Sequence, residues 1–589
     1  MMTLPNHTGI FSWDKINTVL DNIATHSRVS DLSTGHNTNS VSAPLFPRAI
    51  AFITFNYGID GVTIEIAKYA QCLTELFERK EFPLPIHFIG GNFFKQADVF
   101  IPQNAPRLRI PHFDGWNKWQ EGKWFQKLFF EPMPSGSALS NKIATEIWHQ
   151  ALTSARRLIR YIQNQNIDLL IPVNVNSNPG NLASALAIVL ASESTGVNVL
   201  NSNHDFFWEG GCPACKQNPN APPGLRDHFF TNHKNRPFFK LFQRILPWNG
   251  EKWLQLNINN QQIQSLSHQY GVPSSRLFPM GTSIDDEFFT HCPPEKKTLH
   301  RLKMAHILSR GSPVIKPTPV VLFLEQIDHW MANQIPVVCG ADDASPLEIT
   351  TSQALYLLQP TRIVAKKRIF KNWELMEALF SHTDFKLAFD SCPERTLTIH
   401  VTGPVPMEHQ ADLEKILLTF KKLQDALPRH IARRLFTAFS VGHEFHDSFT
   451  CQGFRQLGMD EIYKMADMVF LPSETEGRGL PILEGGASGI PVVCSRYQPE
   501  QTFNEVIGVH LPPGLKIHYI LFPEQHFSLS LLNEIKTLLL HPKKYNAHAR
   551  HNRRAVSARY NSNALKSNLN DAINNLAPCH GQMAGLNRG

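Results

Sequence analysis

The sequence contains no apolar run long enough to cross a bilayer. Its most apolar helical stretch, residues 182–191, has about half the length that a membrane-spanning helix needs. Residues 1–14 also lack the basic start and the apolar segment of a secretory signal peptide. We therefore expect a cytoplasmic protein. The basic, helix-forming segment 531–576 suggests peripheral contact with an anionic membrane, although a solvated helix face is the simpler interpretation.

Cysteine and strong net charge are scarce as well. The nine cysteines form an odd, irregularly spaced set, which is typical of reduced thiols and not of a disulfide framework. The formal net charge of +7 over 589 residues suits anionic ligands but does not indicate a nucleic-acid partner. A chain of this length exceeds a single hydrophobic core, so we expect about two to four domains.

Short apolar strands alternate with amphipathic helices along most of the chain, which predicts doubly wound α/β domains. In the first half we predict strands at 49–55, 85–90, 107–110, 168–173 and 197–200, with helices at 62–79, 142–164 and 181–194. In the second half we predict strands at 319–324, 335–339, 354–360, 397–401, 435–441, 468–471 and 491–494, with helices at 412–427, 460–466 and from 480. Residues 1–45 are polar and without sustained periodicity, which predicts a disordered extension with at most a short helix near 13–23.

The stretch 468–494 is the most informative part of the chain. It contains an apolar strand, a loop, a helix beginning near Leu480 and stopped by Gly489, and a second apolar strand. This order describes one βαβ unit, whose loop lies at the carboxyl edge of a parallel sheet, where open α/β sheets bind ligands. Glu476 and Glu484 are expected at this edge. The alternative is a structural turn in which both glutamates cap the helix.

The residues around this pair resemble a known family. The pattern P-S-x-x-E-G-x-G-L-P-x-x-E over 472–484, followed by G-x-P-V-V over 489–493, is similar to the nucleotide-sugar motif of retaining, GT-B-fold glycosyltransferases. The most similar group is glycosyltransferase family 4, also described as glycosyl transferases group 1. The resemblance implies two Rossmann-like domains that face each other across a cleft. Arg478 departs from the family, which more often has an apolar residue there, so donor identity does not carry over.

The resemblance also implies roles for the loop residues. Glu484 would bind the ribose hydroxyls, and Glu476 would hold hydroxyls of the transferred sugar. The backbone from Gly477 through Gly479 to Leu480 would lie alongside the donor. The family retains the anomeric configuration, and the leaving phosphate is thought to accept the acceptor's proton, so no separate general base is required.

A basic pair matches the family's pattern of an arginine followed five residues later by a lysine, and these residues are Arg362 and Lys367. Two fixed cations would stabilise the charge that develops on the departing diphosphate without a metal ion. Arg368 stands where the family commonly has glycine. No Asp-x-Asp motif accompanies this region, so we predict a metal-independent enzyme without a cofactor. The alternative is that both cations are solvated surface charges.

Three residues of the first half match the family more loosely. Gly61, in the loop after the first strand, would approach the donor phosphates, although a plain tight turn explains it equally well. His204 would lie near the transferred sugar, and Asp205 would fix its tautomer or bind a substrate. The alternative is a His–Asp pair that closes a loop.

A metal site is suggested by Cys212-x2-Cys215-x12-His228-x4-His233, whose spacing lies in the zinc-finger range. The intervening sequence, rich in proline and asparagine, leaves little room for the strands of a finger. We therefore predict no metal site. A zinc-stabilised nucleic-acid binder remains an alternative hypothesis, and a catalytically degenerate GT-B scaffold is another.

Together these observations predict a hexosyltransferase that moves a sugar from a nucleotide-sugar donor to a saccharide, a small polyol or acid, or a lipid-linked glycan. No nucleic acid is expected as a partner. The predicted organisation is a disordered extension 1–45, an acceptor domain 46–275, a donor domain 276–530 with an insertion at 293–351, helices 531–577 that return to the first domain, and a tail 578–589.

Overall fold

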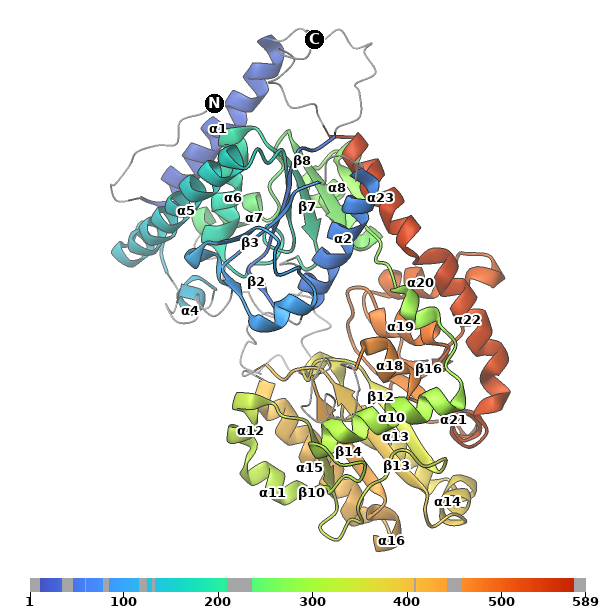
Figure 1. Cartoon of the computed structure of the whole chain (residues 1–589). Coiled ribbons are helices and arrows are strands. Elements are labelled where there is room, and N and C mark those ends of the chain that lie inside the picture. The colour runs from blue at the N-terminus through green and yellow to red at the C-terminus, as the bar shows by residue number, and fades with distance from the viewer. Residues whose placement is uncertain are drawn as a thin grey trace. The chain divides into compact units, whose positions relative to one another are not determined.

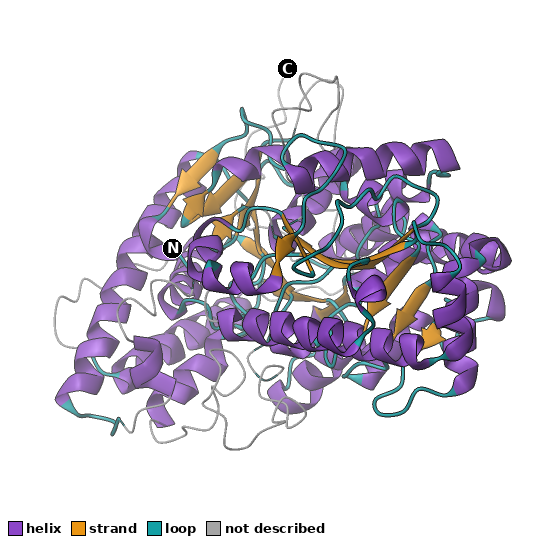
Figure 2. Ribbon diagram, turned by 90° about the horizontal axis from the view of Figure 1, so that it is seen from below, coloured by secondary structure: helices purple, strands orange, loops and turns teal. Residues whose placement is uncertain are grey.

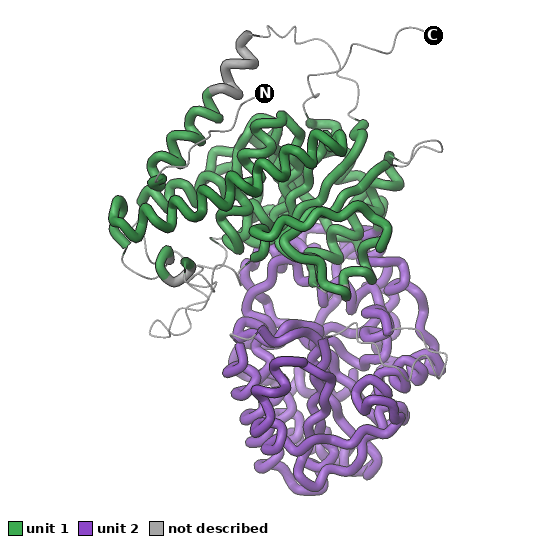
Figure 3. The backbone as a smooth tube through the Cα atoms, turned by 60° about the vertical axis from the view of Figure 1, so that its left-hand side comes forward, with its two compact units in different colours: residues 1–283, 562–589 green, residues 284–561 purple. Residues whose placement is uncertain are grey.

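The computed structural model describes residues 11–33, 46–58, 60–77, 84–115, 124–129, 133–206, 208, 236–406, 409–441 and 457–576. The chain divides into two compact units, drawn in different colours in Figure 3. Unit 1 comprises Met1–Ser283 and Ser562–Gly589, and unit 2 comprises Ile284–Asn561. In the part of the chain that the structure describes, no helix combines the length and the apolar composition that crossing a bilayer requires.

Unit 1 is built on a seven-stranded sheet in which every neighbouring pair is parallel. Its order is β5 (Arg107–Arg109), β3 (Ile86–Gly90), β1 (Ile50–Ile53), β6 (Leu169–Pro172), β7 (Asn198–Asn203), β8 (Trp253–Asn257) and β9 (Leu277–Pro279). Helices cover both faces, so the central strands are buried on both sides and appear in the sequence as continuous apolar runs (Figure 1). Strands β2 (Asn56–Tyr57) and β4 (Asn92–Phe93) form a separate parallel pair. In the chain, β2 follows β1 and β4 follows β3.

Two groups of helices form the outer layers of unit 1. One group packs α5 against α6 and α1 against α7, and the other packs α2 against the C-terminal α23. The helices are α1 (Trp13–Ser33), α2 (Gly61–Phe77), α4 (Trp124–Phe129), α5 (Ala138–Asn164), α6 (Leu182–Thr195), α7 (Arg236–Ile245), α8 (Asn260–Tyr270) and α23 (Ser562–Asn574).

Unit 2 contains an eight-stranded sheet, parallel throughout except for the antiparallel pairing of β11 with β14. Figure 2 shows the strands enclosed by helices. The order is β10 (Thr318–Pro319), β11 (Val337–Gly340), β14 (Leu435–Ser440), β13 (Thr396–Thr402), β12 (Ala354–Gln359), β15 (Met468–Leu471), β16 (Val492–Cys494) and β17 (Ile520–Leu521).

Two apolar clusters form the cores of unit 2. The helices that contribute to them or flank them are α9 (Asp286–Phe289), α10 (Pro294–Ser309), α11 (Val320–Glu325), α12 (Ile327–Asn333), α13 (Lys371–Ser381), α14 (Thr383–Asp390), α15 (Gln410–Ala426), α16 (Arg429–Ala432), α18 (Met459–Lys464), α19 (Leu480–Ser488), α20 (Glu500–Ile507), α21 (Leu529–Leu540) and α22 (Asn546–Arg559). The prediction of doubly wound α/β units is confirmed, because parallel strands alternate with helices in both.

Residues 1–45 are not disordered throughout: the short helix allowed near 13–23 is present as α1 and extends to Ser33. Its apolar residues recur at helical spacing, and Trp13, Ile16 and Leu20 are buried in the core of unit 1. The ring of Phe11 stacks on Trp148 of α5 with 4.5 Å between centroids. Because the stretch is mostly polar, its composition does not indicate the full length of this helix, which tertiary packing stabilises. Residues 34–45 lie outside the described residues, as does the tail from 577.

The segment 293–351, predicted as an insertion in the donor domain, lies within unit 2. Its strands β10 and β11 extend the sheet, and its helix α10 packs against α18. The predicted strand at 319–324 is wrong, since residues 320–325 form α11. A short apolar run does not distinguish a buried strand from a buried helix.

The predicted domain boundaries also differ from the observed units. Unit 2 begins at Ile284 and keeps α21 and α22, so the return to unit 1 starts only at Ser562. Two arginines hold α22 on unit 2. Arg553 donates to the carbonyls of Ala487 and Ser488 at the end of α19, and Arg559 donates to carbonyls at the end of α20. These contacts cap helix C-termini with positive charge.

Candidate active site

The candidate site forms where the chain order of the unit 2 sheet switches direction. Strands β12 and β15 are parallel neighbours, with Leu357 opposite Met468, although more than one hundred residues separate them. The chain continues from β12 to β13 on one side and from β15 to β16 on the other. Loops that follow two such strands diverge and leave a crevice at the carboxyl edge, which is the usual ligand site of an open α/β sheet.

Glycines determine the shape of the loop after β15. Gly479 has a φ of +61° and precedes α19, and Pro481 occupies the first helical turn, where its missing N–H costs nothing. Gly489 has a φ of +73° and ends the helix. The predicted start near Leu480 and stop at Gly489 are therefore confirmed. An added Cβ on Gly479 would lie 2.3 Å from Oη of Tyr497, so this position has no room for a side chain.

Backbone hydrogen bonds hold the same loop on both sides. The N–H of Glu476 donates to the carbonyl of Gln498 over 3.0 Å, and the N–H of Gln498 donates to the carbonyl of Glu474 over 2.7 Å. On the other side, the N–H of Glu474 donates to the carbonyl of Lys366 over 2.8 Å. The loop after β15 is thus fixed to the loop after β12 and to the segment after β16.

Lys367 and Glu476 meet at this edge. Nζ of Lys367 lies 2.5 Å from Oε1 of Glu476, and the two side chains are only 12% and 9% exposed. Burial lowers the pKa of Lys367, and the neighbouring carboxylate opposes this by stabilising the ammonium. The positive charge of Arg362 acts on the same group, and Arg362 itself is exposed. The structure therefore brings one residue of the predicted basic pair into direct contact with one of the predicted carboxylates.

Arg368 adopts a left-handed conformation, with a φ of +47°, directly after Lys367. A glycine would adopt this conformation without steric cost, which fits the glycine that the resembled family commonly has at this position. The guanidinium contacts Glu474 at 3.6 Å and Glu524 at 2.5 Å. The Glu474 ion pair gives a second link between the loops after β12 and β15, and the Glu524 ion pair joins the loop after β12 to the segment after β17.

Glu484 is the fifth residue of α19 and accepts a hydrogen bond from Oη of Tyr463 at 2.5 Å. Tyr463 belongs to α18 and is fully buried. Burial raises the pKa of Tyr463 well above its usual value, and the carboxylates of Glu484 and Glu476 raise it further. Because both carboxylates act on one phenol, Glu476 and Glu484 share one electrostatic environment. Sequence analysis missed Tyr463, which no local motif distinguishes from an ordinary core residue.

The remaining predicted residues belong to unit 1. Gly61 begins α2, and an added Cβ there would meet no atom within 4 Å. His204 follows β7, and its carbonyl accepts a hydrogen bond from Nε2 of Gln262 at 3.2 Å. These two residues therefore lie at the carboxyl edge of the unit 1 sheet, after β1 and β7 respectively.

Asp205 is exposed, and two asparagines of the loop after β6 orient it. Nδ2 of Asn174 donates to Oδ2 of Asp205 at 3.0 Å, and Nδ2 of Asn178 donates to the same oxygen at 3.4 Å. In return, the N–H of Asp205 donates to Oδ1 of Asn174 at 3.0 Å. Asn174 has a φ of +61°, which asparagine tolerates better than most residues. Sequence analysis did not single out either asparagine.

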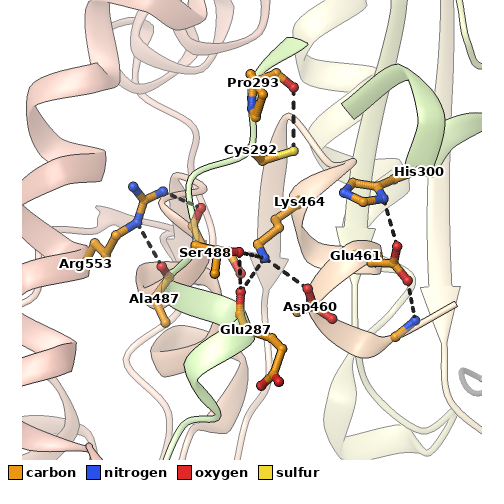
Figure 4. A network of polar contacts seen from close by, with 12 residues as sticks. Glu287, Cys292, Pro293, His300, Asp460, Glu461, Lys464, Ala487, Ser488 and Arg553 are labelled. Atoms are coloured by element: carbon orange, nitrogen blue, oxygen red, sulfur yellow. Dashed lines mark hydrogen bonds and ion pairs between the residues drawn. The ribbon is translucent and has the colours of Figure 1, made fainter. Parts of the chain in front are cut away.

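Buried polar contacts hold helix α18 on α10 and on the segment 287–290 (Figure 4). Glu461 contacts Lys303 at 2.7 Å and His300 at 3.1 Å, both from α10. Lys464 donates to the carbonyl of Glu287 and, at 2.7 Å, to Oγ1 of Thr290. Glu461 and Lys464 are both buried, so these contacts join the start of unit 2 rigidly to α18.

Replacing Glu461 with glutamine is expected to remove a pH-dependent part of the stability. Burial opposes ionisation of Glu461, but the contacts from His300, the Gly458 N–H and Lys303 outweigh it and lower the pKa to about 2. Because the folded pKa lies below the unfolded value, this stabilisation is complete above about pH 5 and is lost as the pH falls from about 4.5 towards 2. The shift corresponds to roughly 3 kcal/mol.

Urea titrations between pH 2.5 and 7 measure this effect. The wild type should lose free energy of unfolding across the acid window, whereas Glu461→Gln should be less stable at pH 7 and should depend less on pH below 4.5. Glu295→Gln, an exposed residue of α10, is the control and should behave like the wild type. Equal acid slopes in the wild type and Glu461→Gln would contradict the interpretation.

The suggested zinc ligands, Cys212, Cys215, His228 and His233, lie outside the described residues. Within the described ranges, no group of three or more His, Cys, Asp or Glu side chains is arranged to hold a metal ion. The structure therefore does not test the zinc hypothesis itself.

Comparison with known proteins connects this site to sugar transfer. Residues 443–517 match the family model described as "Glycosyl transferases group 1". A curated relative, mannosylglucosylglycerate synthase of Petrotoga mobilis, is 24% identical over 156 residues. That match covers 26% of this chain and 30% of the relative, so the similarity spans less than a third of the relative's length.

Among solved structures, the N-terminal domain of Candida albicans trehalose-6-phosphate phosphatase has a TM-score of 0.50 at 10% identity, over 91% of this chain and 98% of that one. A glycosyltransferase from Rickettsia africae has a TM-score of 0.49 at 13% identity, over 90% and 98% of the two chains. The first similarity shows a shared α/β fold. The segment that matches the family model, 443–517, contains Glu476, Glu484 and Tyr463.

Proposed function

We propose that this protein is a retaining hexosyltransferase of the GT-B type that uses a nucleotide-sugar donor. The observation that carries the proposal is the contact of Lys367 with Glu476 at the switch point of the unit 2 sheet, beside Glu484. The family match over 443–517 supports the same reaction class. A buried lysine and two carboxylates at one sheet edge suit a ligand that carries both phosphate and hydroxyl groups.

In the proposed complex, Glu484 accepts hydrogen bonds from the ribose and Glu476 from hydroxyls of the sugar. Lys367 and Arg362 bind the diphosphate, and the backbone N–H groups from Gly477 to Leu480 lie beside it. The bond between the anomeric carbon and the phosphate oxygen breaks while the acceptor oxygen bonds to the same carbon. The acceptor's proton passes to the leaving phosphate. The cations stabilise the negative charge that develops on the diphosphate.

In the proposed reaction, the contact with Glu476 holds the Lys367 ammonium in place. A lysine side chain is flexible, and its ammonium must be fixed before the transition state if it is to stabilise developing charge without reorganisation. Glu476 fixes it at 2.5 Å and also favours its charged form, which burial alone would disfavour. The pair is thus preorganised for a diphosphate that arrives with the donor.

For unit 1 we propose that His204 and Asp205 contact the transferred sugar or the acceptor and that Gly61 approaches the donor phosphates. Asn174 and Asn178 keep the Asp205 carboxylate oriented, which suits a ligand that donates hydroxyl hydrogen bonds. The curated relative is named for a product that contains glycerate. Small hydroxy acids and their glycosides are therefore the first acceptors to test.

The test begins with thermal shift of the full chain in the presence of nucleoside diphosphates and nucleotide sugars, since a ligand that binds the native state raises Tm. The donor found in this way is then incubated with candidate acceptors, and free nucleoside diphosphate and product anomer are measured. Release of diphosphate with a product of the donor's anomeric configuration supports the proposal. Binding without turnover over a broad acceptor panel would favour the degenerate scaffold instead.

Chelation is expected to leave turnover unchanged. In the proposed mechanism Lys367 and Arg362 neutralise the leaving diphosphate, so no divalent ion is required. Initial rates with and without EDTA, each repeated after readdition of Mg²⁺ or Mn²⁺, measure this directly. A rate that falls with EDTA and returns with metal would overturn metal independence. Metal analysis of the purified protein separately tests the zinc hypothesis for residues 212–233.

We also propose a cytoplasmic location with peripheral contact to anionic membrane through the basic segment 543–554. Arg553 and Arg559 are occupied in capping helices, so this contact would use the exposed Lys543 and Lys544, which precede α22, and Arg554 within it. Electrostatic attraction of this kind is weak and salt-sensitive. Cosedimentation with vesicles containing phosphatidylserine, at low and high salt, tests it against neutral vesicles.

A further inference from the structure

Tyr463 has a buried phenol whose hydroxyl donates a hydrogen bond to Glu484, the carboxylate proposed to bind the nucleotide. Its side chain is fully buried, its Oη lies 2.5 Å from Oε2 of Glu484, and its ring packs edge-on against Phe288 with 5.7 Å between centroids. We propose that Tyr463 is a positioning residue that orients Glu484 and thereby sets the enzyme's preference for ribose over 2′-deoxyribose nucleotides. This inference rests on the proposed function and adds to it a determinant of donor specificity.

The phenol acts as a hydrogen-bond donor across the working pH range. Burial raises the pKa of Tyr463 well above its usual value, so the hydroxyl keeps its proton. Glu484 therefore accepts the bond at Oε2. A charge-assisted bond of this length is among the stronger side-chain contacts in proteins and restricts rotation of the carboxylate about its last torsion.

The position of the phenol is itself fixed. Helix α18 spans only six residues, and two more of its buried side chains are bound to neighbouring segments. Glu461 is bound to Lys303 and His300, and Lys464 is bound to the segment before α10 (Figure 4). These contacts fix the helix, so Tyr463 keeps its place if the Glu484 carboxylate turns.

Specificity follows from this rigidity. Ribose presents two neighbouring hydroxyls, and a carboxylate recognises both only when its plane is correctly oriented. A site built to accept both bonds loses a bond when the 2′-hydroxyl is missing, which costs affinity for the deoxy compound. Without Tyr463, Glu484 loses one contact that fixes the plane of its carboxylate, so the advantage of the ribose form becomes smaller.

The experiment compares Tyr463→Phe with the wild type, using UDP, GDP and ADP and their 2′-deoxy counterparts as probes in isothermal titration. For the base that binds, we expect the wild type to prefer the ribose form by about tenfold or more and the variant to prefer it by about threefold or less. With the matching sugar donor, KM should rise while kcat changes little, because the lost contact orients the nucleotide and not the reacting carbon.

Tyr356→Phe is the matched control. Tyr356 lies on β12 of the same unit, is fully buried, and its hydroxyl has no hydrogen-bond partner among the described residues. Its removal should leave both affinities and their ratio unchanged. If Tyr463→Phe also lowers stability, the ratio between the two sugars still reports on positioning, because a general loss of folded protein reduces both affinities equally. Glu484→Gln combined with Tyr463→Phe should lower the ratio no further than either change alone.

Three outcomes are informative. A smaller ribose preference in Tyr463→Phe, with an unchanged preference in Tyr356→Phe, supports the proposal. An unchanged preference in Tyr463→Phe overturns it while leaving the transferase assignment intact. If the wild-type protein binds none of these nucleotides and no nucleotide sugar, the proposed function itself fails, and with it the basis of this inference.

Discussion

Replacing Lys367 with glutamine is expected to lower kcat by about 10²–10³-fold, the usual effect of removing one preorganised donor to developing charge. The ammonium sits 2.5 Å from Glu476 at the switch point of the unit 2 sheet. Glutamine keeps the length of a polar side chain but carries no charge, so it cannot neutralise a departing diphosphate. Steady-state rates with the donor found by thermal shift measure the change.

The single substitution also affects folding, and this effect must be separated from catalysis. Both side chains of the pair are nearly buried, so Lys367→Gln leaves the Glu476 carboxylate without its cation, at a cost of up to about 3 kcal/mol. The double variant Lys367→Gln with Glu476→Gln removes both charges and should recover most of that stability. It should nevertheless stay inactive, because both groups contact the donor in the proposed complex.

Lys366→Gln is the control for this series. Lys366 precedes Lys367 in the chain and is exposed. Its loss should reduce turnover by less than about threefold, as expected for a screened surface charge. A Lys367→Gln variant with wild-type kcat and wild-type stability would show that the buried pair has no part in sugar transfer.

Replacing Gly479 with alanine is expected to have the second large effect. Its φ of +61° lies in the left-handed region, which costs a non-glycine residue about 1–2 kcal/mol. The new methyl would also stand 2.3 Å from Oη of Tyr497, a separation that real structures do not show. The loop between Glu476 and Leu480 must therefore shift. A displacement near 1 Å at such a position can lower turnover about 10²-fold.

A second variant shows which cause dominates. Gly479→Ala combined with Tyr497→Phe removes the oxygen that the methyl meets, so part of the stability and turnover should return, while the cost of the left-handed backbone remains. Gly514→Ala is the control within unit 2, because an added Cβ there meets no atom within 4 Å. If the double variant is no better than Gly479→Ala, the clash with Tyr497 is not the cause.

Some parts of this protein could be read from local sequence because local chemistry determines them. Within the strand–loop–helix unit of 468–494, the helix is bounded by Gly479 and Gly489, which adopt left-handed conformations that few other residues accept. The central strands are apolar on both faces, so their runs are recognisable without knowledge of their neighbours. The basic pair after β12 was located by its resemblance to the family's pattern, and Lys367 contacts Glu476.

Other parts could not be read, because their residues are stabilised by partners distant in the chain. Strand β8 includes the polar residues Gln255 and Asn257, whose burial is not expected from the sequence. Nδ2 of Asn203 on β7 donates a hydrogen bond to each of them at 3.1 Å, which satisfies their side-chain oxygens. The Lys303–Glu461 ion pair joins residues more than 150 positions apart, and so does the Arg368–Glu524 ion pair. A pattern search within a window does not detect such pairs.

The sequence by itself determined the βαβ unit, because glycine conformations and apolar periodicity act over a few residues. The resemblance to a known family singled out the two carboxylates and the basic pair. Only the tertiary structure decided which of these groups touch and how each is held. Tyr463 can position Glu484 because α10 fixes α18 and α19 places Glu484 within hydrogen-bond distance of the phenol. Such an arrangement depends on the packing of three helices, and packing is a property of the whole fold.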